Sequence, residues 1–250
     1  MNVLRAYLTT MTEGMPTRDH FPTTHATWLS DRVGVANDEV ARHIMERYFE
    51  PLRAYVKGSS LRNFGDSADL VNDFFASRLD DPTYLERWLA SGLPLRRWLL
   101  NGLLLHVRNR AIAESRRRAR GDAGVGGDGA RAHDLANARA TNGAEPDALA
   151  ALERAWAIGL VTEAHDRVRV GLIAEHRENW WECFRLHVLH GLPYADACPM
   201  AGVSVANGAN IVRAVSKRLA TMLAELLSRD GVAEADIDAE LELIQRLVQR

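Results

Sequence analysis

Apolar side chains recur at intervals of three and four residues along almost the whole of this chain. The first such run follows Asn37, and its apolar members are Ile44, Met45, Tyr48, Leu52 and Tyr55. This spacing places them on one side of an α-helix, which has 3.6 residues per turn. We find no sustained alternation of apolar and polar residues between turn signals, the pattern of a half-buried strand. The sequence therefore predicts an all-α protein.

Capping residues, prolines and glycines divide this pattern into separate predicted helices. Ser67 is the expected cap of the second helix, Asp81 and Pro82 begin the third, and Pro51 is expected to kink or divide the first. The predicted helical segments are about 38–55, 67–79, 82–91, 95–118, a block from 147, a block that ends at 191, then 194–198, 204–227 and 234–250.

One stretch interrupts the helical pattern. Residues 121–145 contain six glycines and no aromatic residue, so they lack the side chains that build a core. We predict a flexible linker over 121–146 between two helical domains, 21–120 and 147–230. A flexible leader is expected over 1–20 and an amphipathic C-terminal helix over 231–250.

Composition narrows the class of protein. No apolar run reaches the length of about 18–20 residues that a membrane span needs. The N-terminus lacks the pattern of a secretory signal, and Cys183 and Cys198 are too few for a disulfide framework. We therefore expect a cytoplasmic protein that is neither a membrane protein nor a secreted disulfide scaffold.

A predicted helix-turn-helix over residues 193–222 is the strongest functional signal. Its second helix has an apolar side formed by Val212, Val215, Leu219 and Met222. Asn210, Arg213 and Lys217 project to the other side. Arginine and lysine bind guanine edges or phosphates, and asparagine binds adenine, so this is a candidate DNA-recognition helix. The alternative is the solvated face of an ordinary bundle helix.

A second signal is the basic end of the long helix predicted from residue 95. Six arginines and a single acid, Glu114, lie between Arg108 and Arg120, although the net charge of the chain is only -2. Such a cluster favours binding to a phosphate backbone. The alternative is a solvated helix end that leads into the linker. Trp88 and Trp98 nearby are expected in the core rather than stacked on unpaired bases.

Two further clusters do not indicate an active site. Asp69, Asn72 and Asp73 share one side of the helix predicted over 67–79, without a nucleophile or third ligand at a supporting spacing. A polar docking surface for a protein partner fits them better. The helical spacing of Cys183, His187 and His190 could align metal ligands, but no second ligand pair accompanies them, so packing is the favoured interpretation. We expect no enzymatic activity, metal or cofactor.

The order of these features resembles that of the extracytoplasmic function (ECF) sigma factors, small two-domain specificity subunits of bacterial RNA polymerase. One segment, DSADLVNDFFASRL (66–79), resembles the polymerase-binding helix of that family. A second segment, LRRWLLNGLLLHVRNRAIAESRRRAR (95–120), resembles its promoter-melting helix. Its minus-35 helix-turn-helix is similar to YADACPMAGVS followed by IVRAVSKRL. Two further segments resemble a divergent branch of the family that is known from planctomycetes: FPTTHATWL (21–29) and ALERAWAIGLV (151–161).

The resemblance implies two DNA-facing domains and a set of partners. The chain would bind core RNA polymerase at two places, the beta-prime clamp and the beta flap. The residues that would bind the clamp are Asp69, Asn72, Asp73 and Phe74. The implied promoter-DNA contacts are Arg97, Asn101, Arg108, Asn109, Arg116, Arg117 and Arg118 around the minus-10 element, and Asn210, Arg213, Lys217 and Arg218 at the minus-35 element. An anti-sigma factor or a regulatory kinase would be a further partner.

Three residue patterns depart from the family. Asn72 stands where glutamine is usual, the recognition helix is less basic than the norm, and Pro199 falls inside the first helix of the helix-turn-helix. Two alternatives to a sigma factor stay open. One is a self-sufficient helix-turn-helix regulator that binds duplex DNA without polymerase. The other is a polymerase-binding adaptor that lacks promoter recognition.

Overall fold

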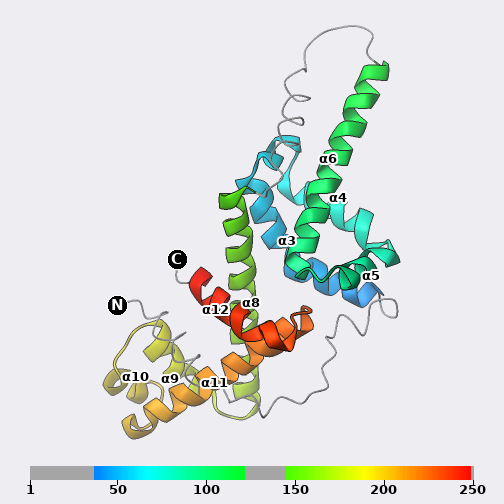
Figure 1. Cartoon of the computed structure of the whole chain (residues 1–250). Helices are drawn as coiled ribbons and strands as arrows, with labels where there is room; N and C mark the ends of the chain where they lie inside the picture. The colour runs from blue at the N-terminus through cyan, green and yellow to red at the C-terminus, as the bar shows by residue number, and fades with distance from the viewer. Residues whose placement is uncertain (1–36, 122–144, 249–250) are drawn as a thin grey trace. The chain divides into compact units, whose positions relative to one another are not determined.

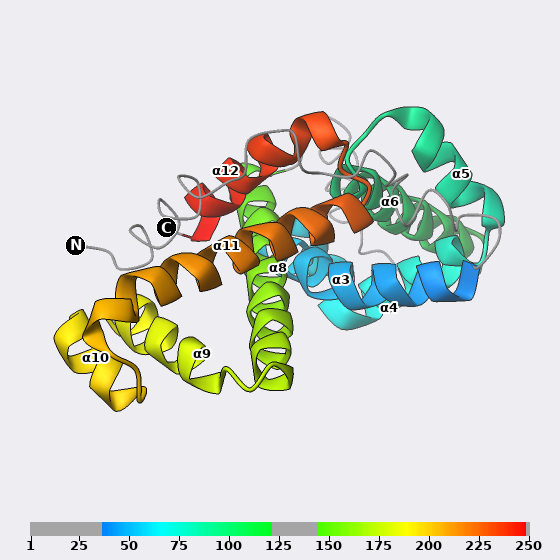
Figure 2. The same cartoon turned by 90° about the horizontal axis from the view of Figure 1, so that it is seen from below.

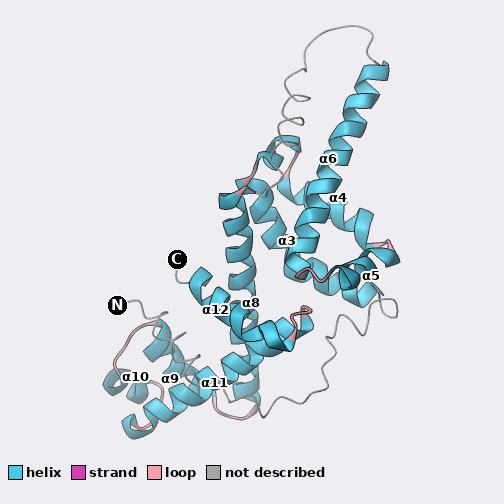
Figure 3. Ribbon diagram, viewed as in Figure 1, coloured by secondary structure: helices cyan, strands magenta, loops and turns pink. Residues whose placement is uncertain are grey.

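The computed structural model describes residues 37–121 and 145–248, and within these residues all regular structure is helical (Figure 3). The all-α prediction is confirmed. The elements are α3 (Asn37–Gly58), η2 (Ser60–Phe64), α4 (Ser67–Leu79), α5 (Pro82–Ser91), α6 (Leu95–Gly121), α8 (Pro146–Ala174), α9 (Glu178–Phe184), η3 (Arg185–Leu189), α10 (Tyr194–Met200), α11 (Val205–Arg229), η4 (Glu234–Asp236) and α12 (Ile237–Val248). Among the described helices, none combines the length and the apolar character of a membrane span.

The described chain forms two compact units, residues 37–156 and residues 157–248, which divide inside α8 (Figure 1). The linker predicted over 121–146 lies largely in residues 122–144, and the leader predicted over 1–20 precedes residue 37. Both lie outside the described residues, so the predicted domain limits stay predictions.

In the first unit, α3 packs along α4, and α4 contacts α5 and α6. Phe74 and Phe75 of α4 and Leu99 and Leu103 of α6 are almost fully buried in this core. The helix α3 runs through Pro51 as one element, so the proline does not divide it. The ring of Pro51 is buried, and this packing compensates for the backbone hydrogen bond that proline cannot donate.

The N-terminal caps of α4 and α5 are both aspartates. Asp66, not the predicted Ser67, caps α4, and its carboxylate accepts hydrogen bonds from the backbone N–H groups of Ala68 and Asp69. Asp81 caps α5 ahead of Pro82, as predicted. An aspartate cap satisfies N–H groups that have no partner within the helix, and its negative charge suits the helix dipole.

The first turns of α8 complete the first unit. The carboxylate of Glu145 accepts a hydrogen bond of 2.9 Å from the backbone N–H of Ser60. The guanidinium of Arg96 lies 4.6 Å from the ring centre of Trp156, which is 1% exposed. Within residues 147–156, which the sequence places at the start of the second domain, Trp156 therefore contacts α6, and Ala148 lies against Gly58 at the end of α3.

In the second unit, α9 and α10 both pack against α11, and α12 packs against α11 further along (Figure 2). The helix α9 continues into a π-helical segment, η3, which ends before Gly191. Phe184, Val215 and Leu219 are fully buried at the centre of this unit. The apolar face predicted for the recognition helix is thus the face that packs on the rest of the unit.

Candidate nucleic-acid and protein interfaces

The helix-turn-helix consists of α10, a tight turn and α11. Gly202 in the turn has a φ of 71°, a left-handed conformation that favours glycine. The N–H of Val203 donates to the carbonyl of Cys198 at 2.9 Å, and the N–H of Gly202 donates to that of Pro199 at 3.1 Å. This pair of bonds is a Schellman motif, which ends α10 sharply.

Pro199 does not shorten α10, which extends to Met200. The proline is the sixth residue of a seven-residue helix, so it removes a single hydrogen bond near the helix end. Ser204 is the N-terminal cap residue of α11, although its side chain makes no capping hydrogen bond. The turn predicted over 202–204 is therefore present at the expected place.

Close packing fixes the angle between α10 and α11. A Cβ atom added to Gly208 of α11 would lie 2.5 Å from the Sγ atom of Cys198 and 2.8 Å from the ring of Tyr194. Only a residue without a side chain leaves room for α10 at this distance. Tyr194 is also stacked on His187, with 3.7 Å between ring centres. These contacts join α10 to both η3 and α11.

The exposed and buried sides of α11 follow the sequence prediction. Asn210, Arg213 and Lys217 are exposed, whereas Val212 and Val215 are buried. The guanidinium of Arg213 donates to Oδ1 of Asn210 at 3.2 Å. Two cations and an amide therefore face solvent along one side of the helix.

Arg218 is placed differently from its neighbours. Its two terminal nitrogens donate to the two carboxylate oxygens of Glu175, at 2.7 and 2.8 Å. These hydrogen bonds and the nearby charge lower the pKa of Glu175 and raise that of Arg218. Arg218 thus ties α11 to the loop after α8. No local sequence pattern indicates this pairing, because 43 residues separate the partners.

The basic end of α6 is exposed. The side chains at Asn101, Arg108, Asn109, Arg116 and Arg117 face solvent. Arg97 instead forms a salt bridge of 3.2 Å with Glu153 of α8, with 41% of its side chain exposed. Arg118 belongs to α6, but its side chain lies outside the described residues.

The two tryptophans near this helix are packing residues, as favoured by the sequence. Trp88 is 4% exposed, and its indole N–H donates to the carbonyl of Leu93 at 2.9 Å. The ring of Trp98 is half-buried and packs against Tyr84, with 5.5 Å between ring centres.

The solvent face of α4 carries Asp69, Asn72 and Asp73, all exposed. We call these three residues the α4 surface. Phe74 does not belong to it: this side chain is fully buried and packs edge-on against Tyr84. Phe74 is buried, and not part of the predicted polymerase-binding face, because position 74 lies on the apolar side of the helix together with Leu70 and Val71.

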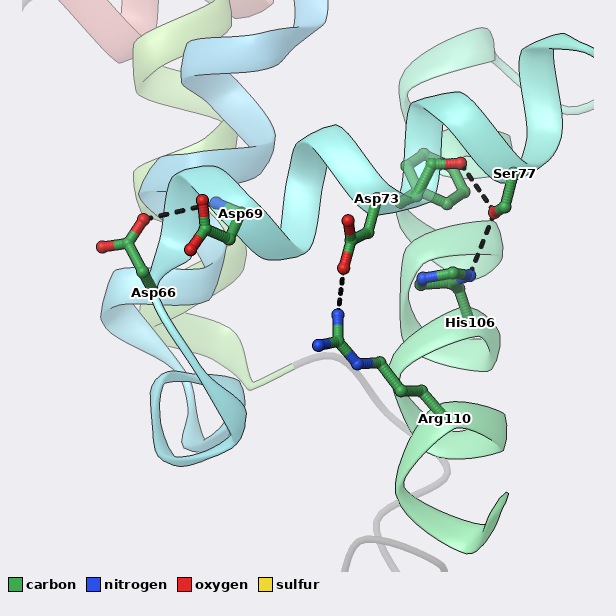
Figure 4. A network of polar contacts seen from close by, with 7 residues as sticks. Asp66, Asp69, Asp73, Ser77, His106 and Arg110 are labelled. Carbon is green, nitrogen blue, oxygen red and sulfur yellow. Dashed lines mark hydrogen bonds and ion pairs between the residues drawn. The ribbon is translucent and has the colours of Figure 1, made fainter. Parts of the chain in front are cut away.

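A polar network joins the α4 surface to α6 (Figure 4). Arg110 forms an ion pair with Asp73, and one turn away the hydroxyl of Ser77 lies 3.1 Å from Nδ1 of His106. Burial lowers the pKa of His106. Arg110 is one of the six arginines between Arg108 and Arg120. Its ion pair with Asp73 depends on the packing of α4 on α6, which the sequence pattern does not show.

Cys183, His187 and His190 do not converge on a metal site. The thiol of Cys183 lies 3.7 Å from that of Cys198, Nδ1 of His187 lies 2.7 Å from the carbonyl of Leu192, and Arg185 contacts His190. Within the described ranges, no group of three or more His, Cys, Asp or Glu residues is placed to hold a metal ion.

Comparison with known proteins finds no matching family model, no matching curated protein and no matching solved structure.

Proposed function

We propose that this chain is a bacterial RNA polymerase sigma factor of the ECF class, which directs core polymerase to particular promoters and catalyses no reaction itself. The observation that carries the proposal is the arrangement of α11 in a helix-turn-helix. One side is buried against α9 and α10, and the other exposes Asn210, Arg213 and Lys217. This is the side that a recognition helix inserts into the major groove.

The first unit supplies the features that support polymerase binding. The α4 surface is polar and negatively charged, and its helix is held rigidly because Phe74 and Phe75 anchor the opposite side in the core. A rigid acidic face suits a basic protein partner, since complementary charge steers association. We propose the clamp of the polymerase beta-prime subunit as this partner, with the beta flap binding the second unit.

The exposed end of α6 supports a role at the minus-10 element. Arg108, Asn109, Arg116 and Arg117 face solvent and can bind phosphates of the opened strand. Asn101 is exposed two turns earlier on the same helix. Arg97 and Arg218 are held by Glu153 and Glu175, so we assign them to positioning of the helices rather than to base reading.

The decisive experiment measures binding of the purified full chain to bacterial core RNA polymerase. The wild type is compared with the double variant Asp69→Ala/Asp73→Ala, which removes two charges from the α4 surface. A matched control, Asp38→Ala/Glu46→Ala, removes two exposed charges from α3 instead. We expect stoichiometric binding by the wild type and the control, and its loss in the α4 variant.

Run-off transcription from a library of genomic fragments then tests promoter selection. Transcripts that require the chain, and that disappear with Arg213→Ala/Lys217→Ala, would support a sigma factor. Duplex binding by the chain alone without binding to core polymerase would favour the self-sufficient regulator. Polymerase binding without any promoter-specific transcript would favour the adaptor.

A further inference from the structure

Four exposed residues form a single line along α11, and we call them the reading stripe. They are Ala206, Asn210, Arg213 and Lys217. Their spacings of four, three and four residues place them on one side of a helix. Gly208, Ile211 and Val215 are buried on the opposite side of α11, so the stripe lies on the side of this helix that faces away from the core.

The amino-terminal part of the reading stripe has no positive charge. The sequence contains no lysine or arginine between Arg185 and Arg213, a stretch that includes all of α10, the turn and the first two turns of α11. Arginine or lysine bound to guanine is the commonest specific contact between a protein and a base. The first two turns of α11 cannot make this contact, although the N-terminal residues of a recognition helix are those that contact base edges.

Within the first two turns of α11, the stripe contains Ala206 and Asn210, and Asn210 supplies its polar side chain. Arg213 donates to its Oδ1 atom at 3.2 Å, one turn along the helix. This bond orients the amide, and it leaves the second lone pair of Oδ1 and both amide hydrogens for another partner. An asparagine amide in that state matches adenine, which offers a donor at N6 and an acceptor at N7.

Small apolar side chains flank Asn210. Ala206 lies one turn before it, and Ala209 lies beside it, both exposed. In the major groove, the methyl group that such side chains contact belongs to thymine.

We infer that the first two turns of α11 read A·T base pairs, with Asn210 bound to adenine and Ala206 and Ala209 packed on thymine methyl groups. Arg213 orients Asn210, and Lys217 binds the phosphate backbone. This inference rests on the proposed function, because it takes α11 to enter the major groove of a promoter.

Selection from a library of random duplexes tests the inference. The full chain, alone and with core polymerase, is incubated with a duplex that contains a randomised segment, and the bound molecules are sequenced. We expect an enriched site with consecutive A·T pairs. Asn210→Arg should change one of these positions from A·T to G·C with a preference of about tenfold, because arginine binds guanine through two hydrogen bonds. Lys217→Ala should weaken all sites alike and leave the preferred sequence unchanged.

A second test changes the DNA, first with the wild-type protein and then with the variant Ala206→Gly. Replacing thymine by uracil in the selected site removes the methyl group of the base. We expect the affinity of the protein for the site to fall about fourfold for each methyl that is contacted. Replacing Ala206 by glycine should reduce this sensitivity.

The outcomes separate the inference from the function on which it rests. A selected site rich in G·C pairs, or one unaltered by Asn210→Arg and insensitive to uracil, would overturn the A·T reading while leaving sequence-specific DNA binding intact. Failure to enrich any sequence, with or without core polymerase, would overturn both.

Discussion

Arg218 in the recognition helix is bound to Glu175 by two parallel hydrogen bonds of 2.7 and 2.8 Å. Glu175 lies just after α8, so the pair connects α11 to the loop that precedes α9. A second arginine, Arg177, approaches the same carboxylate at 3.4 Å. The residue predicted as a DNA contact is therefore part of the frame that supports the recognition helix.

The pair makes stability depend on pH in a defined direction. Hydrogen bonds from Arg218 lower the pKa of Glu175 in the folded protein, relative to its ordinary value of 4.5. Its contribution is fully present above that value and is lost as the pH falls through the lowered pKa. We therefore expect Glu175→Gln to lower the melting temperature near neutral pH and to have a diminishing effect as the solution is acidified below the ordinary value.

The measurement is a series of melting curves for the wild type and the variant across the acidic range. Glu225→Gln, which changes an exposed acid of α11, serves as the control and should follow the wild type throughout. A difference between Glu175→Gln and the wild type that stays constant at all pH values would show that the ionised carboxylate of Glu175 does not stabilise the fold.

Gly208 is the most restrictive position in the helix-turn-helix. Gly208→Ala would bring a methyl group to 2.5 Å from the Sγ atom of Cys198, so α10 must move away from α11. We expect a loss of stability of about 1–3 kcal/mol, typical of overpacking, measured by urea unfolding. Removing the obstructing sulfur with Cys198→Ala should restore part of this loss in the double variant.

The matched control is Gly159→Ala in α8, where an added Cβ has no neighbour within 4 Å. This change should stabilise the protein by about 0.5–1 kcal/mol, because alanine loses less conformational entropy than glycine in a helix. Equal effects of the two substitutions would contradict the close approach of α10 and α11.

The sequence predicted what depends on local chemistry. Helix starts at Asp81 and Ser204, the turn at Gly202 and the two faces of α11 all follow from capping, conformational preference and periodicity. The cap at Asp66 was missed by one residue, because aspartate and serine stand side by side and both suit a cap.

Contacts between distant residues could not be predicted in this way. Nothing near Asp73 in the sequence indicates its ion pair with Arg110, and nothing near Arg218 indicates Glu175. The burial of Phe74 was within reach, since its apolar neighbours on α4 share its side of the helix. Exposure and pairing depend on which helices pack together, which is a property of the whole fold.

Trp156 anchors the first turns of α8 to the first unit. Its ring is 1% exposed and is covered by the guanidinium of Arg96. Trp156→Ala should destabilise this unit by about 3–5 kcal/mol, since it removes a large buried ring and leaves a cavity. Urea unfolding measures the loss, and Ile158→Ala, at a position of α8 that is 49% exposed, should change stability little.

The same contact predicts which fragment folds. A fragment of residues 21–156 retains the buried side chains of Leu152 and Trp156, whereas a fragment of residues 21–120 lacks them and exposes the part of α6 around Arg96 that Trp156 covers. We expect the longer fragment to unfold at higher urea concentration. Equal midpoints would show that the start of α8 adds nothing to the stability of this unit.

The two cysteines provide a chemical probe of the helix-turn-helix. Both thiols are fully buried, 3.7 Å apart between α9 and α10, and burial together with the neighbouring thiol raises the pKa of Cys183 to about 12. Because the thiolate is the nucleophile, iodoacetamide should leave both unmodified in the native protein near neutral pH and add two labels after unfolding in urea. Mass spectrometry counts the labels. Gly208→Ala should accelerate labelling by opening the contact between α10 and α11, and labelling of the native wild type at the rate of an exposed thiol would contradict this packing.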